Sequence, residues 1–567
     1  MTNHITHHSV RWWVAFAICL MFGILLLYNG CSRKRSSAAK DYVVVGIEGD
    51  VDTFNPLYAE DANASDIIDL VFPSMTRTTF DSSRGAITQI PSLARSWEFL
   101  NSGKDILFHL RSGARWADGS AVNAEDVQYS YIMYADTSVG SVRQDAASAF
   151  LKSGTIPDVR KSIEVKDDST VIFHFDHLYA GELFDAGLPL LPSHLYEKIE
   201  RNKIHQDSSL RIPVGAGPFN VKEWKPLQDI ILTPNTESTL PHPGRYSQII
   251  FRIIPDYYQR LAQIRSGEID VLPYIEIADA DALIRDKVAV QIYRLGPRFY
   301  DAINWNNIDG IEYAKSKGKH IIPNKLFGNK KIRQALTMAI NRKQIIDAFF
   351  RSYGRVAFSP ISPMFRWAYN DSIRPLSYNP DSAKKLFAAA GWKDTDGDGI
   401  LDKDGKKFSF VLKIPSGNQV RAQIAAIVQE QLKAISVDMK IEQQERGAFW
   451  GAIMDKNFDA CIAGFNVPLQ MQLDELWGGD LQKSRFNIPS FQNIRIDEIL
   501  AGARQVSQET DYAPQWKEFQ RIIEHEQPCT FLYWQTDLVA ANNRIHHANI
   551  DALGITYNAA DWEEAPR

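Results

Sequence analysis

The 567-residue chain lacks the short motifs that mark common enzyme and metal chemistry. It contains no G-x-S-x-G nucleophile elbow and no H-E-x-x-H zinc motif, so the usual patterns of serine hydrolases and zinc peptidases are absent. It also has no C-x-x-C pair, no internal repeat and no low-complexity segment. Scattered acids could pair in space as a glycosidase requires, but no sequence signal selects a pair. We therefore predict no catalytic residues, no cofactor and no metal centre.

Cysteine is scarce, with four residues in the chain. Cys19 and Cys31 fall in the N-terminal segment, and Cys461 and Cys529 each lie in an apolar run typical of a strand. An oxidising compartment would permit a bridge between the latter two. We favour two buried free thiols, because cysteine is often simply a small buried hydrophobe.

The chain has no excess of positive charge. It carries 63 Lys and Arg against 68 Asp and Glu, and 45% of its residues are hydrophobic, as in an ordinary soluble globular protein. Residues 1–30 hold one base, Arg11, and no acid, so the remainder has 62 bases against 68 acids, or a net charge of −6. A mildly acidic body argues against nucleic acid as a partner.

Only one long apolar run occurs, from Trp12 to Tyr28, and Asn29-Gly30-Cys31 follows it. A basic residue, an apolar stretch and a small residue before a cysteine predict a lipoprotein export signal over 1–30, a lipid on Cys31 and a polar tether over 31–40. Tyr28 stands where such signals usually have Leu, and the run reaches the short limit for crossing a bilayer. An uncleaved N-terminal anchor is therefore the alternative. Either device would hold the body in the periplasmic or extracytoplasmic space.

The stretch from Leu93 to Tyr131 predicts a hairpin, a tight turn and a capped helix. Trp97 and Phe99, then Ile106, Phe108 and Leu110, alternate with polar residues as in half-buried strands. The segment 101–105 between them is rich in turn residues. Asp118-Gly119 makes a second turn, and Asn123 is a good N-cap before two acids in the first helical turn.

This succession resembles the signature of the family 5 extracellular solute-binding proteins, the oligopeptide- and dipeptide-binding lipoproteins that serve ABC importers. The residues that carry the resemblance include R-x-G-x-x-W-x-D-G at 111–119, followed by the A-E-D-V helix start. Similar segments to those of the family occur at 43–58, 214–219, 331–342 and 458–465. The resemblance covers nearly all of residues 41–557.

The resemblance implies an α/β chain with the type II periplasmic-binding-protein fold, in which two lobes joined by a hinge carry an extra subdomain. Leu295-Gly296-Pro297 is a candidate hinge. The three domains would be discontinuous, and ligand would be enclosed between the lobes. The expected division is 41–62 for the first part of domain I, 63–213 for domain II, 214–295 for the second part of domain I, 296–525 for domain III and 526–567 for the C-terminal return to domain I.

A calcium-like loop begins at Asp394, Asp396 and Asp398. The D-x-D-x-D-G pattern matches the first half of an EF-hand loop, but its twelfth position is Gly405 where a bidentate Glu is needed. We favour a structural loop of Asx turns and keep calcium as the weaker candidate.

The segment Gly464–Trp477 departs from the pattern of the peptide-binding relatives, which the resemblance implies would have an aspartate there for the peptide's amino group. The corresponding positions hold Gln470 and Gln472, or Pro468 in another register. Glutamine can accept hydrogen bonds but cannot neutralise a buried ammonium group. Asp474 or Glu475 could substitute.

A second departure is Arg446, which stands where peptide binders commonly have tryptophan. It is either a surface arginine or a residue that shifts the pocket toward neutral or anionic ligands. The resemblance also implies that Asp50, Val51 and Asn55 lie at the cleft edge, and apolar pockets commonly include aromatic residues. The predicted ligand-binding residues are Asp50, Val51, Asn55, Arg446, Phe465, Asn466, Gln470, Gln472 and Trp477.

These observations predict a monomeric, membrane-tethered receptor that captures an oligopeptide or related small solute and delivers it to the permease subunits of an ABC transporter. Two other classes stay open. One is a sensory or scaffolding receptor that keeps the fold and binds a non-peptide ligand. The other is an envelope hydrolase.

Overall fold

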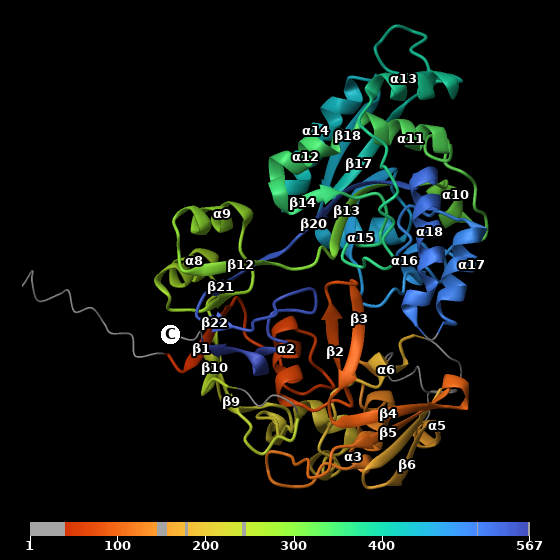
Figure 1. Ribbon diagram of the computed structural model, residues 1–567. Coiled ribbons are helices and arrows are strands. Elements are labelled where there is room, and N and C mark those ends of the chain that lie inside the picture. The colour runs from red at the N-terminus through yellow and green to blue at the C-terminus, as the bar shows by residue number, and fades with distance from the viewer. Residues whose placement is uncertain (1–39, 145–155, 176–179, 241–244, 507, 565–567) are drawn as a thin grey trace, which may run out of the picture. The chain divides into compact units, whose positions relative to one another are not determined.

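Two mixed β-sheets organise the body of the protein in the computed structural model, which describes residues 40–144, 156–175, 180–240, 245–506 and 508–564 (Figure 1). Contacts divide the chain into a unit ending at Tyr42 and the body from Val43 onward. The predicted export segment and Cys31 lie outside the described residues. Along the described residues, no helix combines the length and apolar composition that a bilayer crossing requires.

The first sheet has seven strands, which come from three separate parts of the chain. Its core strand, β1, is an apolar run with buried side chains from Val43 to Ile47, and Val45 pairs in parallel with Val271. In sheet order the strands are β12 (Val290–Arg294), β21 (Leu538–Asn542), β11 (Val271–Leu272), β1 (Tyr42–Ile47), β10 (Gln248–Ile253), β9 (Asp229–Pro234) and β8 (Phe219–Lys225).

The second sheet has six strands, all from the C-terminal half of the chain. β13 pairs antiparallel with β19 and β20, whereas β17 runs parallel to β18 and β19. In sheet order the strands are β14 (Gly354–Val356), β20 (Cys529–Gln535), β13 (Phe299–Trp305), β19 (Ala460–Asn466), β17 (Ser409–Pro415) and β18 (Asp438–Gln444).

The chain passes twice between these two sheets. The predicted hinge, Leu295-Gly296-Pro297, joins β12 to β13, and a second passage joins β20 to β21. The two passages touch, since the Leu295 amide donates to the Asp537 carbonyl at 2.9 Å. β20 belongs to the six-stranded sheet, so the chain enters the seven-stranded sheet after Gln535, beyond the predicted boundary at 526. The domain division stays a prediction.

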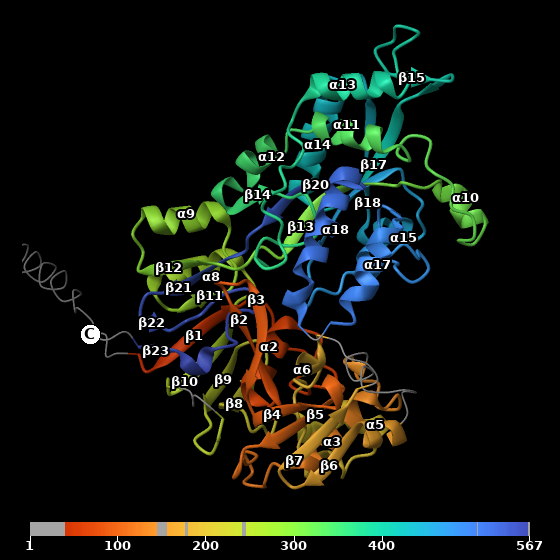
Figure 2. The same cartoon turned by 45° about the vertical axis from the view of Figure 1, so that its right-hand side comes forward.

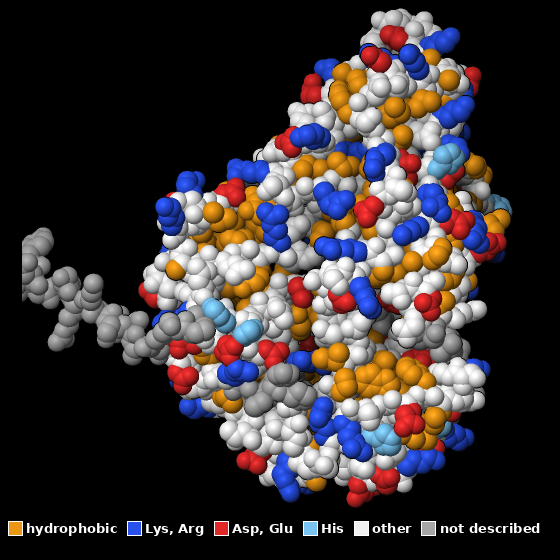
Figure 3. All heavy atoms as spheres, in the orientation of Figure 1, with side chains coloured by type: hydrophobic (Ala, Val, Ile, Leu, Met, Phe, Trp, Pro, Cys, Tyr) orange, Lys and Arg blue, Asp and Glu red, His pale blue; other side chains and the backbone are white. Residues whose placement is uncertain are grey.

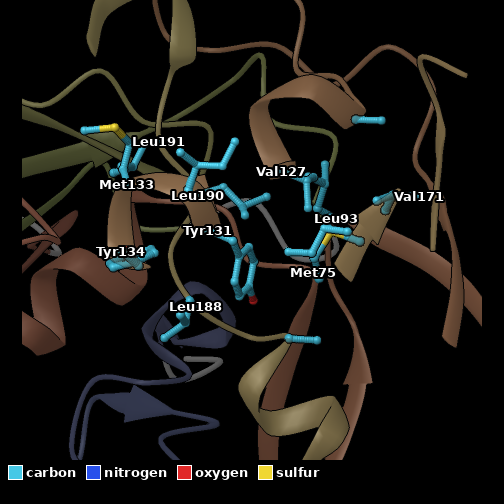
Figure 4. Packing of buried hydrophobic residues seen from close by; sticks show 14 of the residues in the cluster. Met75, Leu93, Val127, Tyr131, Met133, Tyr134, Val171, Leu188, Leu190 and Leu191 are labelled. Carbon is cyan, nitrogen blue, oxygen red and sulfur yellow. The ribbon is translucent and has the colours of Figure 1, made fainter. Parts of the chain in front are cut away.

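A third, four-stranded sheet contains the predicted hairpin. β4 (Ala94–Leu100) pairs with β5 (Asp105–Leu110), and β7 (Thr170–His174) and β6 (Ile163–Asp167) follow in sheet order. Helix α3 (Ala124–Ala135) packs on this sheet with the core residues drawn in Figure 4, where Tyr131 lies among leucine and valine side chains. The Asn123 side chain accepts from the amides of Glu125 and Asp126, which confirms the predicted cap.

The Asp126 carboxylate accepts hydrogen bonds that join the turn at Trp116, the start of α3 and Ser193. One carboxylate oxygen accepts from the Trp116 indole N–H at 3.2 Å and from the Asn123 amide at 3.0 Å. The other accepts from the Ser193 amide at 3.0 Å and its hydroxyl at 2.7 Å. Because Asp126 is only 2% exposed, each of these bonds replaces one that water would make. Residues of the segment that resembles the family signature are therefore held together by one carboxylate.

The strand prediction for Trp97 and Phe99 is confirmed, but their burial differs from expectation. Trp97 is half-buried and its ring is tilted by 55° against that of Phe108, whereas Phe99 is 48% exposed. Phe99 lies near the end of β4, beside the exposed Leu100 and the turn Asn101–Gly103, and its side chain lines a cavity described below.

A two-stranded ribbon, β2 (Thr76–Asp81) and β3 (Ala86–Pro91), stands beside helix α2 (Ala62–Val71) in the rotated view of Figure 2. α2 packs in the core of the seven-stranded sheet through Ile67, Ile68 and Val71, because these residues share one helical face. Asp61 caps its N-terminus. The ribbon and α2 form walls of the cavities described below.

The remaining longer helices cover the sheets or lie at their ends. Those of the seven-stranded sheet are α8 (Tyr257–Ser266) and α9 (Ile277–Arg285). Those nearer the six-stranded sheet are α11 (Lys330–Ala339), α12 (Arg342–Phe349), α13 (Pro380–Ala389), α14 (Gln419–Lys433), α15 (Arg446–Met454), α17 (Ile494–Ala503) and α18 (Ala513–Glu526). Basic and acidic side chains are interspersed over the face drawn in Figure 3, in keeping with the near balance of the two signs.

Candidate ligand-binding site

The segment that follows β19 is held by backbone pairing on one side and is free to face a cavity on the other. Val467 donates its amide to the Arg298 carbonyl at 2.8 Å, and the Arg298 Nε returns a bond to the Val467 carbonyl at 3.2 Å. Further along, the Gln472 amide donates to the Gln470 carbonyl at 2.8 Å. The segment then enters the short helix α16 (Asp474–Trp477).

A cavity of about 900 Å³ opens beside this segment, and we call it the β19 cavity. Phe465, Asn466, Gln470 and Gln472 all line it, so the structure brings four of the predicted residues together. The Gln472 side-chain amide donates to the Gln470 side-chain oxygen at 3.0 Å, which aligns the two amides. The volume lies within the range of small-ligand sites in proteins.

Glu509 supplies a carboxylate that sequence reasoning missed. It lines the β19 cavity from the turn Glu509–Tyr512, and its side chain accepts from the Met471 amide at 3.2 Å. Burial raises the pKa of Glu509 to about 7, against the lowering effect of that bond. Nothing in the surrounding sequence marks this residue, because its approach to Met471 depends on the fold of α17 and the turn after it. Asp474 also lines the cavity but pairs with Arg504.

The predicted cleft-edge residues make contacts within the fold. They line neither this cavity nor the two described next. The Asp50 carboxylate accepts from the Trp224 indole at 3.0 Å and from the Leu227 amide at 2.7 Å. Val51 is buried in the core of the seven-stranded sheet. The Asn55 side chain accepts from the Leu57 amide at 3.1 Å, which closes a local turn. A ligand role for these three residues stays a prediction.

Two more predicted residues lie away from the cavities. Trp477 is buried, with its ring stacked on Phe531 at a centroid distance of 5.9 Å. Arg446 is the first residue of α15 and is exposed. The effect on ligand charge predicted for Arg446 therefore finds no support in the cavity geometry.

Residues of the segment that follows β19 also line two neighbouring cavities. One of about 400 Å³, the ribbon cavity, is lined by β3, Trp97, Phe99 and Gln470. The other, of about 520 Å³, we call the arginine cavity, because Arg77, Arg111 and Arg143 line it. Leu469 lines the arginine cavity, while Gln470 beside it lines the other two.

The aspartate loop after α13 has the hydrogen bonds of Asx turns. Asp394 accepts from the amides of Gly397 and Gly399 at 2.7 and 2.9 Å. The Lys407 ammonium group donates to both Asp396 and Asp398. The three carboxylates could approach one cation, but Lys407 already supplies the positive charge there. The favoured structural interpretation agrees with these contacts, and calcium binding stays untested.

The two body cysteines are free and buried, as expected. Cys461 lies in β19 and Cys529 in β20, on either side of β13. Burial raises the pKa of both thiols, so neither is a ready nucleophile.

Comparison with known proteins follows this geometry. The family described as bacterial extracellular solute-binding proteins, family 5 Middle, matches residues 88–471. The chain is 28% identical to the oligopeptide-binding protein AppA of Bacillus subtilis over 569 aligned residues, which cover 96% of this chain and 97% of that protein. The structure of AppA in complex with a nonapeptide gives a TM-score of 0.66 at 29% identity, covering 93% of this chain and 99% of that chain. The structure of NikZ from Campylobacter jejuni in complex with Ni(L-His) has the same fold, with a TM-score of 0.68 at 23% identity, covering 93% of this chain and 100% of that one.

Proposed function

This chain belongs to the family 5 bacterial extracellular solute-binding proteins, and from this premise we propose that it captures short peptides outside the inner membrane and delivers them to an ABC permease. The α/β periplasmic-binding-protein fold expected from the sequence is confirmed by its structural neighbours. Two of the similar proteins bear on the ligand: AppA is named for oligopeptides and its solved structure holds a nonapeptide.

One observation supports this proposal most directly, namely the β19 cavity with its row of polar groups. Phe465 offers an apolar surface, and Asn466, Gln470 and Gln472 offer both donors and acceptors. Such groups can bind the main chain of an extended peptide without selecting its side chains. Under this proposal the amides take the place of charged anchors along the middle of the ligand.

The peptide's amino group needs a negative partner, and Glu509 is our candidate. Its carboxylate lies at the same cavity as Gln470 and Gln472, the positions at which the resemblance implies an aspartate. The rise in the pKa of Glu509 to about 7 shows that burial penalises its charge, and a bound ammonium group would relieve that penalty. The anchor would thus come from a later part of the chain than the sequence pattern indicates.

The remaining parts of the proposal concern the setting of the receptor. We propose that it performs no chemistry and that the partner ATPase supplies the energy of transport. A lipid on Cys31, or an uncleaved anchor over residues 12–28, would hold it at the membrane as a monomer. Delivery requires docking on permease subunits, which we expect to meet the ligand-loaded form.

Native mass spectrometry of residues 41–567, purified from the expression host, tests the peptide proposal. Co-purifying masses that form a ladder of short peptides are the expected result. A single non-peptide mass, or no ligand together with no response to added peptides, would contradict peptide binding. Either result would favour another solute or a sensory role. Turnover of the bound peptide during the measurement would contradict a purely binding function.

A further inference from the structure

The arginine cavity collects basic side chains from three separate parts of the chain. Arg77 comes from β2, Arg111 from the segment directly after β5, and Arg143 from the segment that follows α3. All three are half-buried. Sequence spacing gives no reason for them to meet, so the fold alone creates this concentration of positive charge.

These arginines have hydrogen-bond donors to spare. The Arg111 Nε donates to the Ser92 carbonyl at 2.7 Å, and the Arg143 Nε donates to the Pro56 carbonyl at 3.1 Å. Those bonds fix two side chains at their Nε atoms and leave the forked ends available, since a guanidinium group has five N–H donors. Within the described part of the chain, no carboxylate lies in ion-pair distance of Arg77, Arg111 or Arg143.

One acid shares the cavity, and it cannot balance three bases. Asp69, near the C-terminal end of α2, lines the same space. Asp69 is exposed to this space; desolvation beside the wall raises the pKa of its carboxyl, and Arg143 opposes this rise without forming a close pair. Three guanidinium groups against one carboxylate leave an excess of two positive charges. An anionic ligand group would meet this excess in a partly enclosed space, where charge-assisted bonds are strong.

Much of the remaining wall is apolar, although hydroxyl groups also line it, from Ser74, Thr76, Thr78, Ser92 and Tyr557. Leucine, isoleucine and phenylalanine side chains surround the charged groups, and those that matter here are Phe72, Ile90, Phe184, Leu188, Leu469 and Leu553. A ligand group suited to this cavity has a negative charge close to an apolar side chain. A free phosphate or sulfate ion would use the arginines but leave the apolar wall uncovered.

The segment that follows β19 lines both the arginine cavity and the β19 cavity, which is the proposed peptide site. Pro468 and Gln470 line the β19 cavity, and Leu469 between them lines the arginine cavity. Phe184 lines both the arginine cavity and the ribbon cavity. A peptide whose amino end is held near Glu509 therefore has the arginine cavity available for its other end.

We infer that the arginine cavity binds the C-terminal carboxylate of the peptide together with an apolar C-terminal side chain, an assignment that rests on the proposed peptide-binding function. The receptor then recognises its ligand by both ends: Glu509 faces the ammonium group, and Arg77, Arg111 and Arg143 face the carboxylate. Side chains in the middle of the ligand are left unselected.

The test uses three randomised pentapeptide libraries made without Asp, Glu or Cys, so that the C-terminus is the only carboxylate. One library has free ends, one is N-acetylated, and one is C-terminally amidated. Each is offered to the ligand-free soluble body, and retained peptides are quantified by mass spectrometry. Because hydrogen bonds to charged groups are the stronger class, amidation should lower retention by about 10- to 100-fold. Apolar C-terminal residues should be enriched among the retained free acids.

Variants assign the effect to the cavity. Arg77→Gln is preferred, because Arg77 makes no hydrogen bond that the fold depends on, and Arg143→Gln provides a second case. Both should weaken retention of the free-acid library and leave the amidated library nearly unchanged, as a double-mutant cycle requires for a direct contact. Arg95→Gln is the matched control, since Arg95 is an exposed arginine on β4 outside the cavity. Melting temperatures confirm that each variant is folded.

The outcomes separate this inference from the function on which it rests. Equal retention of free-acid and amidated peptides overturns the carboxylate assignment and leaves peptide binding intact. Loss of both libraries to the same degree in Arg77→Gln also overturns it, because the arginine would then act on the fold. No retention of any library by the wild type overturns both proposals, and inorganic phosphate added as a competitor shows whether the cavity binds a free anion in its place.

Discussion

Replacing Asp126 with alanine should destabilise the protein by about 4 kcal/mol, although Asp126 lines none of the three cavities. The carboxylate is 2% exposed and accepts four hydrogen bonds from three residues. Three of the donors are N–H groups of fixed direction, on Trp116, Asn123 and Ser193. The fourth is the Ser193 hydroxyl, which can rotate toward another acceptor.

The magnitude follows from the donors that the change leaves unpaired. A buried donor without a partner costs about 1–3 kcal/mol. The Trp116 bond is buried and the Asn123 and Ser193 amide bonds are part-buried, so we use the low end of that range, about 1.3 kcal/mol each, which gives about 4 kcal/mol for the three. Asp126→Asn keeps one oxygen but turns an amide N–H₂ toward a donor pair, so it should fall about halfway between wild type and the alanine variant.

Urea unfolding of residues 41–567, followed by tryptophan fluorescence, measures the change, because the midpoint shifts while the dependence on urea stays constant. Asp118→Ala is the control. Its side chain is 34% exposed and pairs with His194, so its loss should cost less than about 1 kcal/mol. A cost below about 1 kcal/mol for Asp126→Ala, or equal costs for the two variants, would refute the reasoning from unpaired donors.

Three further changes have definite expected outcomes. Arg421→Met removes the two-bond partner of Asp301, whose carboxylate is 1% exposed and also accepts from a tyrosine hydroxyl; urea unfolding should show a loss of about 3–5 kcal/mol, and adding Asp301→Asn should restore part of it. Lowering the pH from 8 to 6 should weaken peptide binding roughly tenfold in calorimetry, because the pKa of Glu509 is raised to about 7 and protonation removes the charge that faces the ammonium group; Glu509→Gln should bind weakly at both pH values, and a wild type indifferent to pH would contradict this role. Calcium should leave the melting temperature of the wild type unchanged but raise that of Lys407→Met, because the lysine bonds two carboxylates of the 394–402 loop; a calcium-induced rise in the wild type would show that the lysine does not exclude the ion.

Local structure was predictable where neighbouring residues determine it. The hairpin of β4 and β5 follows from alternating apolar residues around turn-forming ones, and the start of α3 follows from Asn123. Helix α8 also ends for a local reason, at Gly267, whose φ of 75° is a conformation that favours glycine. Such features depend on a few adjacent residues, so one sequence suffices to find them.

The site was predictable only along a single segment. Phe465, Asn466, Gln470 and Gln472 meet at one cavity because they are close in sequence. Glu509 was missed because a turn forty residues further on brings it to that cavity. Arg77, Arg111 and Arg143 were not predicted for the same reason. Arg446, which was predicted because it stands where peptide binders commonly have tryptophan, is exposed and lines none of the three cavities.

Burial was the weaker part of the sequence prediction even within a correct strand. Phe99 alternates as a half-buried strand residue should, yet it is 48% exposed at the end of β4, where it lines the ribbon cavity. Periodicity states which side chains share a face of a strand, but it does not state what covers that face.

The segment that resembles the family signature therefore indicates the fold more clearly than it indicates the ligand. Trp116, Asn123 and Asp126 are joined by hydrogen bonds within the fold, whereas Trp97 and Phe99 line the ribbon cavity and Arg111 lines the arginine cavity. Under our proposals ligand choice depends on Arg111 within the signature and, to a larger extent, on positions outside it, such as the glutamines after β19 and Glu509. Solved structures with a similar fold hold a nonapeptide in one case and Ni(L-His) in another, so the fold by itself does not specify the ligand. In this protein the decisive evidence for the ligand will come from variants of the cavity residues and not from a closer match to the signature.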